Sequence, residues 1–207
     1  MNYNWNDISW IFKPDGALRN IYVQNTSLND WEKIIDLLND NYILNYHSKN
    51  KIDKEEVFQN LKEIGEKDFK TVSIVIKNIK INCHFFLIEQ IEFDIEPNEI
   101  KTQDDFEKIL SFMTKISSTL KKQITLTGEN DITFPVVKIN VGENVFKIIT
   151  EKEINEYYSK ENSKIKNLIS SWKFSFLMRF FPKFMKNKIL RSANEPIKAT
   201  KLNENLW

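Results

Sequence analysis

A histidine and two carboxylates are the residues of this chain whose types and spacing best fit chemistry. His84 lies in a segment of alternating apolar and polar residues, and Glu92 and Asp94 lie in the next segment of the same kind. If the two segments pair as neighbouring strands, all three side chains share one face of the sheet. An imidazole beside carboxylates can bind a metal ion or transfer a proton. The same pattern also fits the solvated face of a half-exposed sheet, which is the more common case.

Other catalytic groups are scarce in the sequence. Cys83 adjoins His84, but neighbours on a strand project to opposite faces and cannot share a proton. Because Cys83 is in register with Ile81 and Phe85, we expect it to be a small buried residue. One cysteine and two histidines exclude a zinc site of clustered Cys and His, and four isolated glycines form neither a dinucleotide-binding nor a phosphate-binding loop. We therefore assign no metal and no cofactor.

The end of the chain combines positive charge with aromatic side chains. No Asp or Glu occurs between Asn162 and Asn194, and apolar residues there recur at helical spacing up to Pro182, after which a second short helix is expected. Such a segment points to contact with an acidic surface or an apolar groove. The residues that we expect to make this contact are Trp172, Lys173, Phe176, Arg179, Phe180, Lys183, Lys186 and Lys188.

Three interpretations of this basic segment compete. Its apolar stripe can pack on the preceding domain or on a second copy of the chain, which is the usual role of an amphipathic helix. It can instead lie on an anionic membrane surface, with the cations at the lipid headgroups. Nucleic acid is the least favoured partner, because core packing would use the apolar stripe and arginine is rare.

The elements that must position the histidine and the carboxylates form a predicted antiparallel meander. Apolar residues alternate with polar ones over 72–76, 79–85 and 91–95. Lys77 and Asn78 occupy the first hairpin loop, where asparagine tolerates the positive φ that such loops need. Further strands are expected at 10–13, 20–24, 42–46, 124–127, 136–140 and 145–149. Near the first turn, Asp15, Arg19 and Tyr22 form a possible polar cluster.

Three capping boxes mark the predicted helices. Ser27 with Asp30, Thr102 with Asp105, and Thr150 with Glu153 each have the spacing at which side chain and backbone satisfy one another. A further short helix begins near residue 53 and ends at Gly65. We expect the helix that follows Thr102 to lie across the sheet.

Part of the sequence resembles a group of short bacterial proteins of unassigned function. The resemblance rests on the run from Trp10 to Val23, on Asp30 and Trp31, and on the segments 81–86 and 91–95, and it covers about residues 8–150. It implies no activity and no site residue. Small α+β proteins of this kind also look broadly like bacterial immunity proteins, which block a toxin by surface contact.

Composition and charge complete the prediction. The apolar content of 41% is that of a folded domain. Residues 151–207 hold twelve Lys or Arg against six Asp or Glu, a balance of +6, so the first 150 residues carry −5 of the total of +1. We predict an α+β domain over 1–150, with a mostly antiparallel sheet and helices on one face, and a basic amphipathic helical extension over 151–207.

The function predicted from the sequence is binding rather than catalysis. We expect a bacterial protein in the cytoplasm or at the inner face of the membrane, since a single cysteine fits a reducing compartment and no export signal is visible. It would bind a protein partner, in the manner of an immunity protein, and use its basic segment for oligomer or membrane contact. The alternative is a small metal-dependent or acid/base enzyme that uses the face of His84, Glu92 and Asp94.

Overall fold

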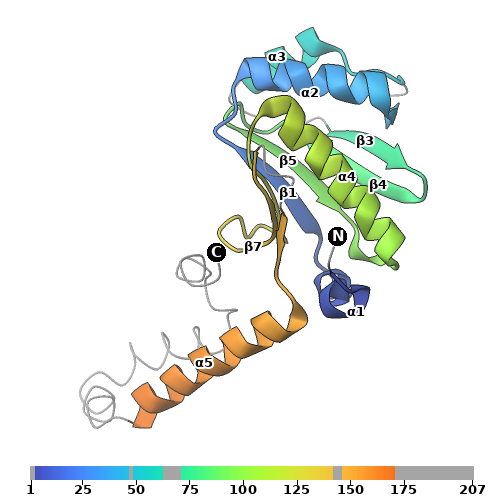
Figure 1. Ribbon diagram of the computed structural model, residues 1–207. Helices are drawn as coiled ribbons and strands as arrows, with labels where there is room; N and C mark the ends of the chain where they lie inside the picture. The colour runs from blue at the N-terminus through green and yellow to red at the C-terminus, as the bar shows by residue number, and fades with distance from the viewer. Residues whose placement is uncertain (1–2, 47–48, 63–70, 142–145, 171–207) are drawn as a thin grey trace. The chain divides into compact units, whose positions relative to one another are not determined.

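The computed structural model describes residues 3–46, 49–62, 71–141 and 146–170. The chain divides into two compact units, Met1–Ile148 and Ile149–Trp207. The first unit holds the sheet, and the second holds the helix α5 (Figure 1).

The first unit is built on one eight-stranded sheet in which every pair of neighbouring strands is antiparallel. The order across the sheet is β2-β3-β4-β5-β1-β6-β7-β8, so the first strand of the chain lies in its middle. The strands are β1 (Arg19–Gln24), β2 (Ile43–Asn45), β3 (Thr71–Ile76), β4 (Ile79–His84), β5 (Gln90–Ile95), β6 (Ile124–Gly128), β7 (Pro135–Ile139) and β8 (Phe146–Ile148).

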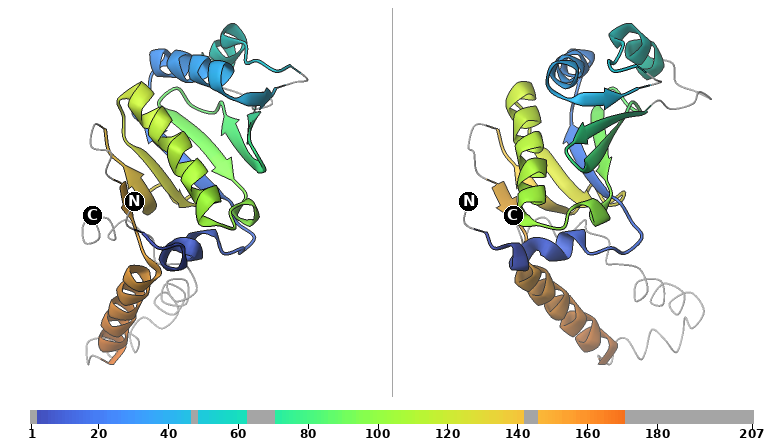
Figure 2. Two further views of the ribbon diagram at one scale, coloured as in Figure 1. Left: turned by 45° about the vertical axis from the view of Figure 1, so that its right-hand side comes forward. Right: turned by 90° about the vertical axis from the view of Figure 1, so that its right-hand side faces the viewer.

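The long helices of this unit cover one face of the sheet. Helix α4 crosses that face, and α2 packs beside α4 (Figures 1 and 2). The helices are α1 (Trp5–Ile8), α2 (Leu28–Asn41), α3 (Lys54–Lys62) and α4 (Gln103–Leu120), with the 3-10 turns η1 (Ser9–Phe12) and η2 (Pro97–Glu99). The α+β prediction, with helices on one face of a mostly antiparallel sheet, is confirmed.

Local sequence determines where α2 and α4 begin. The Ser27 side chain accepts a hydrogen bond from the Asp30 backbone N–H at 3.4 Å, and the Asp30 carboxylate accepts one from the Ser27 N–H at 3.0 Å. Thr102 and Asp105 make the same reciprocal pair at 3.2 Å each. A cap of this kind contributes about 1 kcal/mol to helix stability.

The core lies between the sheet and α2 and α4. Alternate strand residues such as Ile21, Phe93 and Cys83 are fully buried on the face toward the helices, as period-two patterning requires. From α4, Phe112 meets the Phe93 ring edge-on, with 5.3 Å between the ring centroids. Burial raises the pKa of the Cys83 thiol well above its usual value, so this cysteine is a core residue as predicted.

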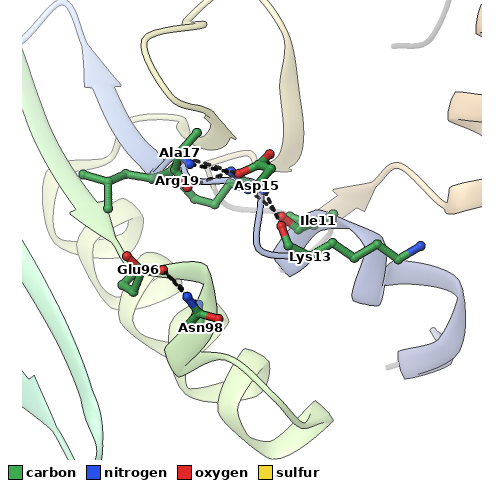
Figure 3. Close-up of polar contacts among 8 residues, drawn as sticks. Ile11, Lys13, Asp15, Ala17, Arg19, Glu96 and Asn98 are labelled. Atoms are coloured by element: carbon green, nitrogen blue, oxygen red, sulfur yellow. Dashed lines mark hydrogen bonds and ion pairs between the residues drawn. The ribbon is translucent and has the colours of Figure 1, made fainter.

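Arg19 anchors the N-terminal segment to the edge of the core (Figure 3). Its guanidinium donates to the backbone oxygens of Ile11 at 2.5 Å and Lys13 at 3.1 Å, and it pairs with Asp15 at 3.0 Å. Asn4 caps α1, which continues into η1, so the predicted strand at Trp10–Lys13 is wrong. The carbonyls of this turn accept from Arg19 instead of from a neighbouring strand.

The hairpin between β3 and β4 differs in detail from its prediction. The loop is Lys77–Asn78 as expected, but the residue with positive φ is Lys77, at 56°. The predicted role of the asparagine there is wrong, because a lysine adopts the conformation that its Cβ disfavours.

The second unit begins with the third predicted capping box. The Thr150 hydroxyl and N–H both donate to the Glu153 carboxylate, at 2.9 and 2.8 Å, and α5 (Glu151–Ser170) follows. The second helix expected after Pro182 lies outside the described residues. Among the residues described, no helix has the length and apolar character needed to cross a membrane.

Candidate functional site: the polar face of the sheet

The strand register brings the predicted chemical residues together on the face of the sheet opposite the helices. His84 on β4 lies directly across from Glu92 on β5, and Asn82 lies across from Asp94. On the other side of β5, Asp94 lies across from Asn20 and Glu92 from Tyr22. The prediction that His84, Glu92 and Asp94 share one face therefore agrees with the strand pairing.

His84 and Asp94 form the centre of a hydrogen-bonded chain. The ring nitrogen Nε2 of His84 lies 2.5 Å from Oδ2 of Asp94, along the diagonal between the two strands. The other carboxylate oxygen, Oδ1, accepts from Asn82 Nδ2 at 2.8 Å, and the Asn82 oxygen accepts from Ser73 at 3.0 Å. Because a carboxylate only accepts hydrogen bonds, Nε2 of His84 must carry a proton.

The second ring nitrogen of His84 is occupied as well. Nδ1 lies 2.9 Å from the hydroxyl oxygen of Thr71, on the neighbouring strand β3. When the ring is neutral, Nδ1 accepts from this hydroxyl, and when the ring is charged it donates to it. Phe86 stacks on the imidazole, with the ring centroids 4.8 Å apart and an interplanar angle of 10°. His84 is thus fixed by hydrogen bonds at both ring nitrogens and by the stacked Phe86 on one face of its ring.

Glu92 belongs to a second cluster next to this chain. Its Oε1 accepts from Asn20 Nδ2 at 3.1 Å and from the Tyr22 hydroxyl at 3.5 Å, and its Oε2 accepts from Gln90 at 3.2 Å. Desolvation raises the pKa of Glu92 above 4.5, partly opposed by nearby His84 and by the hydrogen bonds from Gln90 and Tyr22. Burial and the neighbouring Glu92 also raise the pKa of Tyr22.

The connection between β6 and β7 folds over this part of the face. The backbone N–H of Asn130 donates to the side-chain oxygen of Asn20 at 2.9 Å. Asn20, Tyr22 and Asp94 are each at most 6% exposed. The centre of the polar face is therefore largely shielded from water, and its polar groups depend on one another for hydrogen bonds.

The hydrogen-bonded chain of Thr71, His84 and Asp94 is better suited to transferring a proton than to binding a metal ion. Thr71, His84 and Asp94 stand in the order of hydroxyl, base and carboxylate that is used in acyl transfer. Within the described part of the chain, no group of three or more His, Cys, Asp or Glu side chains has the geometry to hold a metal ion. His84 has no unused ring nitrogen to offer as a ligand.

Other predicted residues are placed differently. Arg19 and Tyr22 do not join one cluster, because residues three apart on a strand lie on opposite faces: Arg19 pairs with Asp15, and Tyr22 contacts Glu92. The basic contact residues from Trp172 to Lys188 lie outside the described residues. Thr71 and Asn20 were missed by the sequence analysis, although the alternation of their strands was a signal that placed them on the polar face.

Comparison with known proteins finds no match. No protein-family model, curated protein or solved structure matches this chain. The resemblance of residues 8–150 to short bacterial proteins stays a prediction, and the function rests on the geometry of the chain itself.

Proposed function

We propose that this chain is a non-enzymatic protein-binding protein. The observation that carries this proposal is the internal saturation of the polar face: both ring nitrogens of His84 and all four carboxylate oxygens of Glu92 and Asp94 already have partners within the sheet. A general base that acts directly on a substrate must offer it a free lone pair, and neither ring nitrogen of His84 has one. A closed network of this kind instead fixes the strand register and gives a rigid platform for contact.

The open edge of the sheet offers an apolar surface for such contact. Ile43, on edge strand β2, is 74% exposed, and its cross-strand neighbour Val75 is 36% exposed. The two side chains lie on the same face as the polar network, beside the hydrophilic Lys80 of β4. An apolar pair with a polar surround is typical of a small protein-protein contact.

The basic segment is the second proposed contact. Its aromatic and cationic residues, from Trp172 to Lys188, would bind a second copy of the chain or an anionic membrane surface. The charge difference between this segment and the net acidic first 150 residues supports contact with an acidic surface. A bacterial, immunity-protein-like role would use the sheet edge for the partner and this segment for location or assembly.

Two full-length variants test this function. In one, His84, Glu92 and Asp94 become Asn, Gln and Asn, which removes the ionisable groups but keeps polar side chains. In the other, Lys183, Lys186 and Lys188 become Gln. Sedimentation with phosphatidylglycerol vesicles and analytical ultracentrifugation measure membrane and self-association. We expect the first variant to behave as the wild type and the second to lose the association.

The opposite pattern would contradict the proposal. If the polar-face variant loses association while the lysine variant keeps it, the network itself is the contact. For a protein partner, Ile43→Asp should abolish co-purification with the product of a neighbouring gene expressed in the same cells, and Lys80→Asp serves as the matched surface control. Equal capture by Ile43→Asp and the wild type would remove the sheet edge from the proposal.

A second candidate function rests on the contact between Thr71 and His84. Here His84 would take the hydroxyl proton of Thr71 while Asp94 holds the ring, and the hydroxyl oxygen would attack the carbonyl carbon of an activated ester and release its phenolate. Water would then hydrolyse the acyl-threonine, which returns the hydroxyl and releases the acid. Hydrolysis of p-nitrophenyl acetate measures this activity. It requires that Thr71→Val and His84→Gln both lose the rate above background, and a wild-type rate equal to that of Thr71→Val excludes it.

A further inference from the structure

A pocket of about 250 Å³ opens at one end of the polar face. Its walls come from the end of β1, the turn between α4 and β6, and β6 itself. Tyr22, Gln24 and Asn25 line one side, and Lys121, Lys122 and Thr125 line another. The volume is below the usual range of about 300–1,000 Å³ for drug-sized ligands. Only a small molecule would fit.

The ionisable side chains of the described lining are mainly cationic. Among the residues that the structure describes, the pocket is lined by Lys121, Lys122 and Tyr22 and by no Asp or Glu. Carboxylates next to the lining are already engaged with it. Asp30 Oδ2 is 3.8 Å from the Lys122 ammonium, and Glu92 accepts from the Tyr22 hydroxyl at 3.5 Å. An anion in the pocket would therefore meet cations first.

Several hydrogen-bond donors of the pocket lining have no partner among the residues that the structure describes. Among the described residues, the side chains of Lys121, Gln24 and Thr125 make no hydrogen bond or ion pair. The Lys122 ammonium is held in place by the Asn25 carbonyl oxygen at 2.7 Å. An ammonium, an amide and a hydroxyl remain for a ligand, with a second ammonium fixed beside them.

Lys121 breaks a local rule of helix termination. It follows the last residue of α4 with a φ of 55°, the left-handed conformation in which glycine is the preferred residue. A lysine near a helix C-terminus gains from the helix dipole, but Lys122 already supplies a cation there. Asn25, on the opposite wall, is also left-handed, with a φ of 56°.

We infer that this pocket binds a small phosphate-bearing ligand, inorganic phosphate or a short phosphate monoester. The terminal oxygens of a phosphoryl group can accept from both lysines and from Thr125 or Gln24 at once, whereas a carboxylate has only two oxygens. The inference goes beyond the proposed binding function and does not depend on it, since it involves neither the sheet edge nor the basic segment. Because Gln24 and Lys121 are exposed to water, the expected Kd for inorganic phosphate is on the order of 1 mM.

The test is a titration of the full-length, ¹⁵N-labelled protein with inorganic phosphate at constant ionic strength. Saturable shifts are expected at the backbone amides of Asn25, Lys122 and Thr125. Lys121→Gly should weaken binding roughly tenfold, because it removes one charge-assisted hydrogen bond. Glycine suits the left-handed backbone at this position, so the variant should keep the Tm of the wild type.

Lys77→Gly is the matched control. It also removes one lysine from a left-handed position, at a φ of 56°, but in the β3–β4 turn outside the pocket. This variant should bind phosphate like the wild type. Equal weakening by Lys77→Gly and Lys121→Gly would overturn the inference, because it would reflect net charge alone.

Two further arms identify the ligand and the location. Glycerol 3-phosphate should produce the same shifts as phosphate, and acetate at equal ionic strength should produce much smaller ones. Stronger shifts with acetate would replace the phosphate assignment by a carboxylate. Shifts confined to residues 164–191 would place the anion on the basic segment and refute the pocket. Neither result bears on the proposed function. The vesicle and partner tests measure membrane association and partner capture, and they do not depend on phosphate binding in the pocket.

Discussion

Replacing Asp94 by alanine or by asparagine should have very different costs. Asp94 is 6% exposed, and its side chain accepts hydrogen bonds from His84 and Asn82. Alanine leaves both donors without an acceptor in a shielded place. Each hydrogen bond to a charged group contributes about 1.5–3 kcal/mol, so the loss of both should lower the free energy of unfolding of Asp94→Ala by about 3–6 kcal/mol.

Asparagine can preserve the network through a change in the histidine. Its amide oxygen can still accept from Asn82, but its nitrogen can only donate toward His84 Nε2. In this orientation the ring proton moves from Nε2 to Nδ1, which donates to the Thr71 oxygen. If the amides at positions 94 and 82 both turn over instead, the proton stays on Nε2 and Asn82 donates to the Ser73 hydroxyl oxygen. With every partner still paired, Asp94→Asn should cost only about 1 kcal/mol.

Urea unfolding followed by tryptophan fluorescence measures the free energies, and two-bond ¹H–¹⁵N spectra of the imidazole identify the protonated nitrogen. The chain has only two histidines, so assignment is simple. Asp104→Ala, which removes a carboxylate that is 75% exposed, is the control and should cause no measurable loss. The reasoning is refuted if alanine and asparagine destabilise the protein equally.

Three other predictions concern buried groups. Arg19→Lys should lower the free energy of unfolding by about 2 kcal/mol, because one ammonium cannot reach the Ile11 and Lys13 carbonyls and Asp15 together; an unchanged urea midpoint would contradict this. Glu92 has a raised pKa in the folded state, so the folded protein binds its proton more tightly than the unfolded chain does, and stability should fall as pH rises from 4.5 through the folded value. Glu92→Gln should remove that fall, and parallel pH profiles of the two proteins would argue against it. The buried Cys83 thiol should react with Ellman's reagent only in urea, and rapid reaction of the native protein would show that the core opens there.

Local signals allowed much of the fold to be predicted. The capping boxes at Ser27 and Thr102 act within four residues of chain, and the β3–β5 meander follows from alternation and short turns. The insertion of β1 between β5 and β6 has no such signal, because it depends on contacts between residues distant in sequence. The turn at Trp10 was wrongly predicted as a strand for a related reason. The Ile11 carbonyl oxygen in this turn accepts from the Arg19 side chain and not from a backbone N–H of a neighbouring strand.

Only the part of the candidate site that follows from strand alternation could be predicted from the sequence. Alternation places His84 and Asp94 on one face, but it does not say that the ring lies diagonally against Asp94 rather than across to Glu92. The role of Thr71 needed the pairing of β3 with β4, and that of Asn20 needed the pairing of β1 with β5. The pocket at Lys121 brings together the end of β1 and the turn after α4, which no sequence pattern links.

The place of β1 in the sheet has a consequence for biosynthesis. This strand leaves the ribosome long before either neighbour, Gln90–Ile95 or Ile124–Gly128, has been made. Both of its hydrogen-bonding edges are therefore open to other nascent chains during translation. Strands β3, β4 and β5 can assemble early as a local meander, whereas β1 gains its second neighbour only after β6 emerges, a slow, non-local step. Any product that stops before residue 124 keeps at least one unpaired edge on β1, which is a site for pairing with other chains.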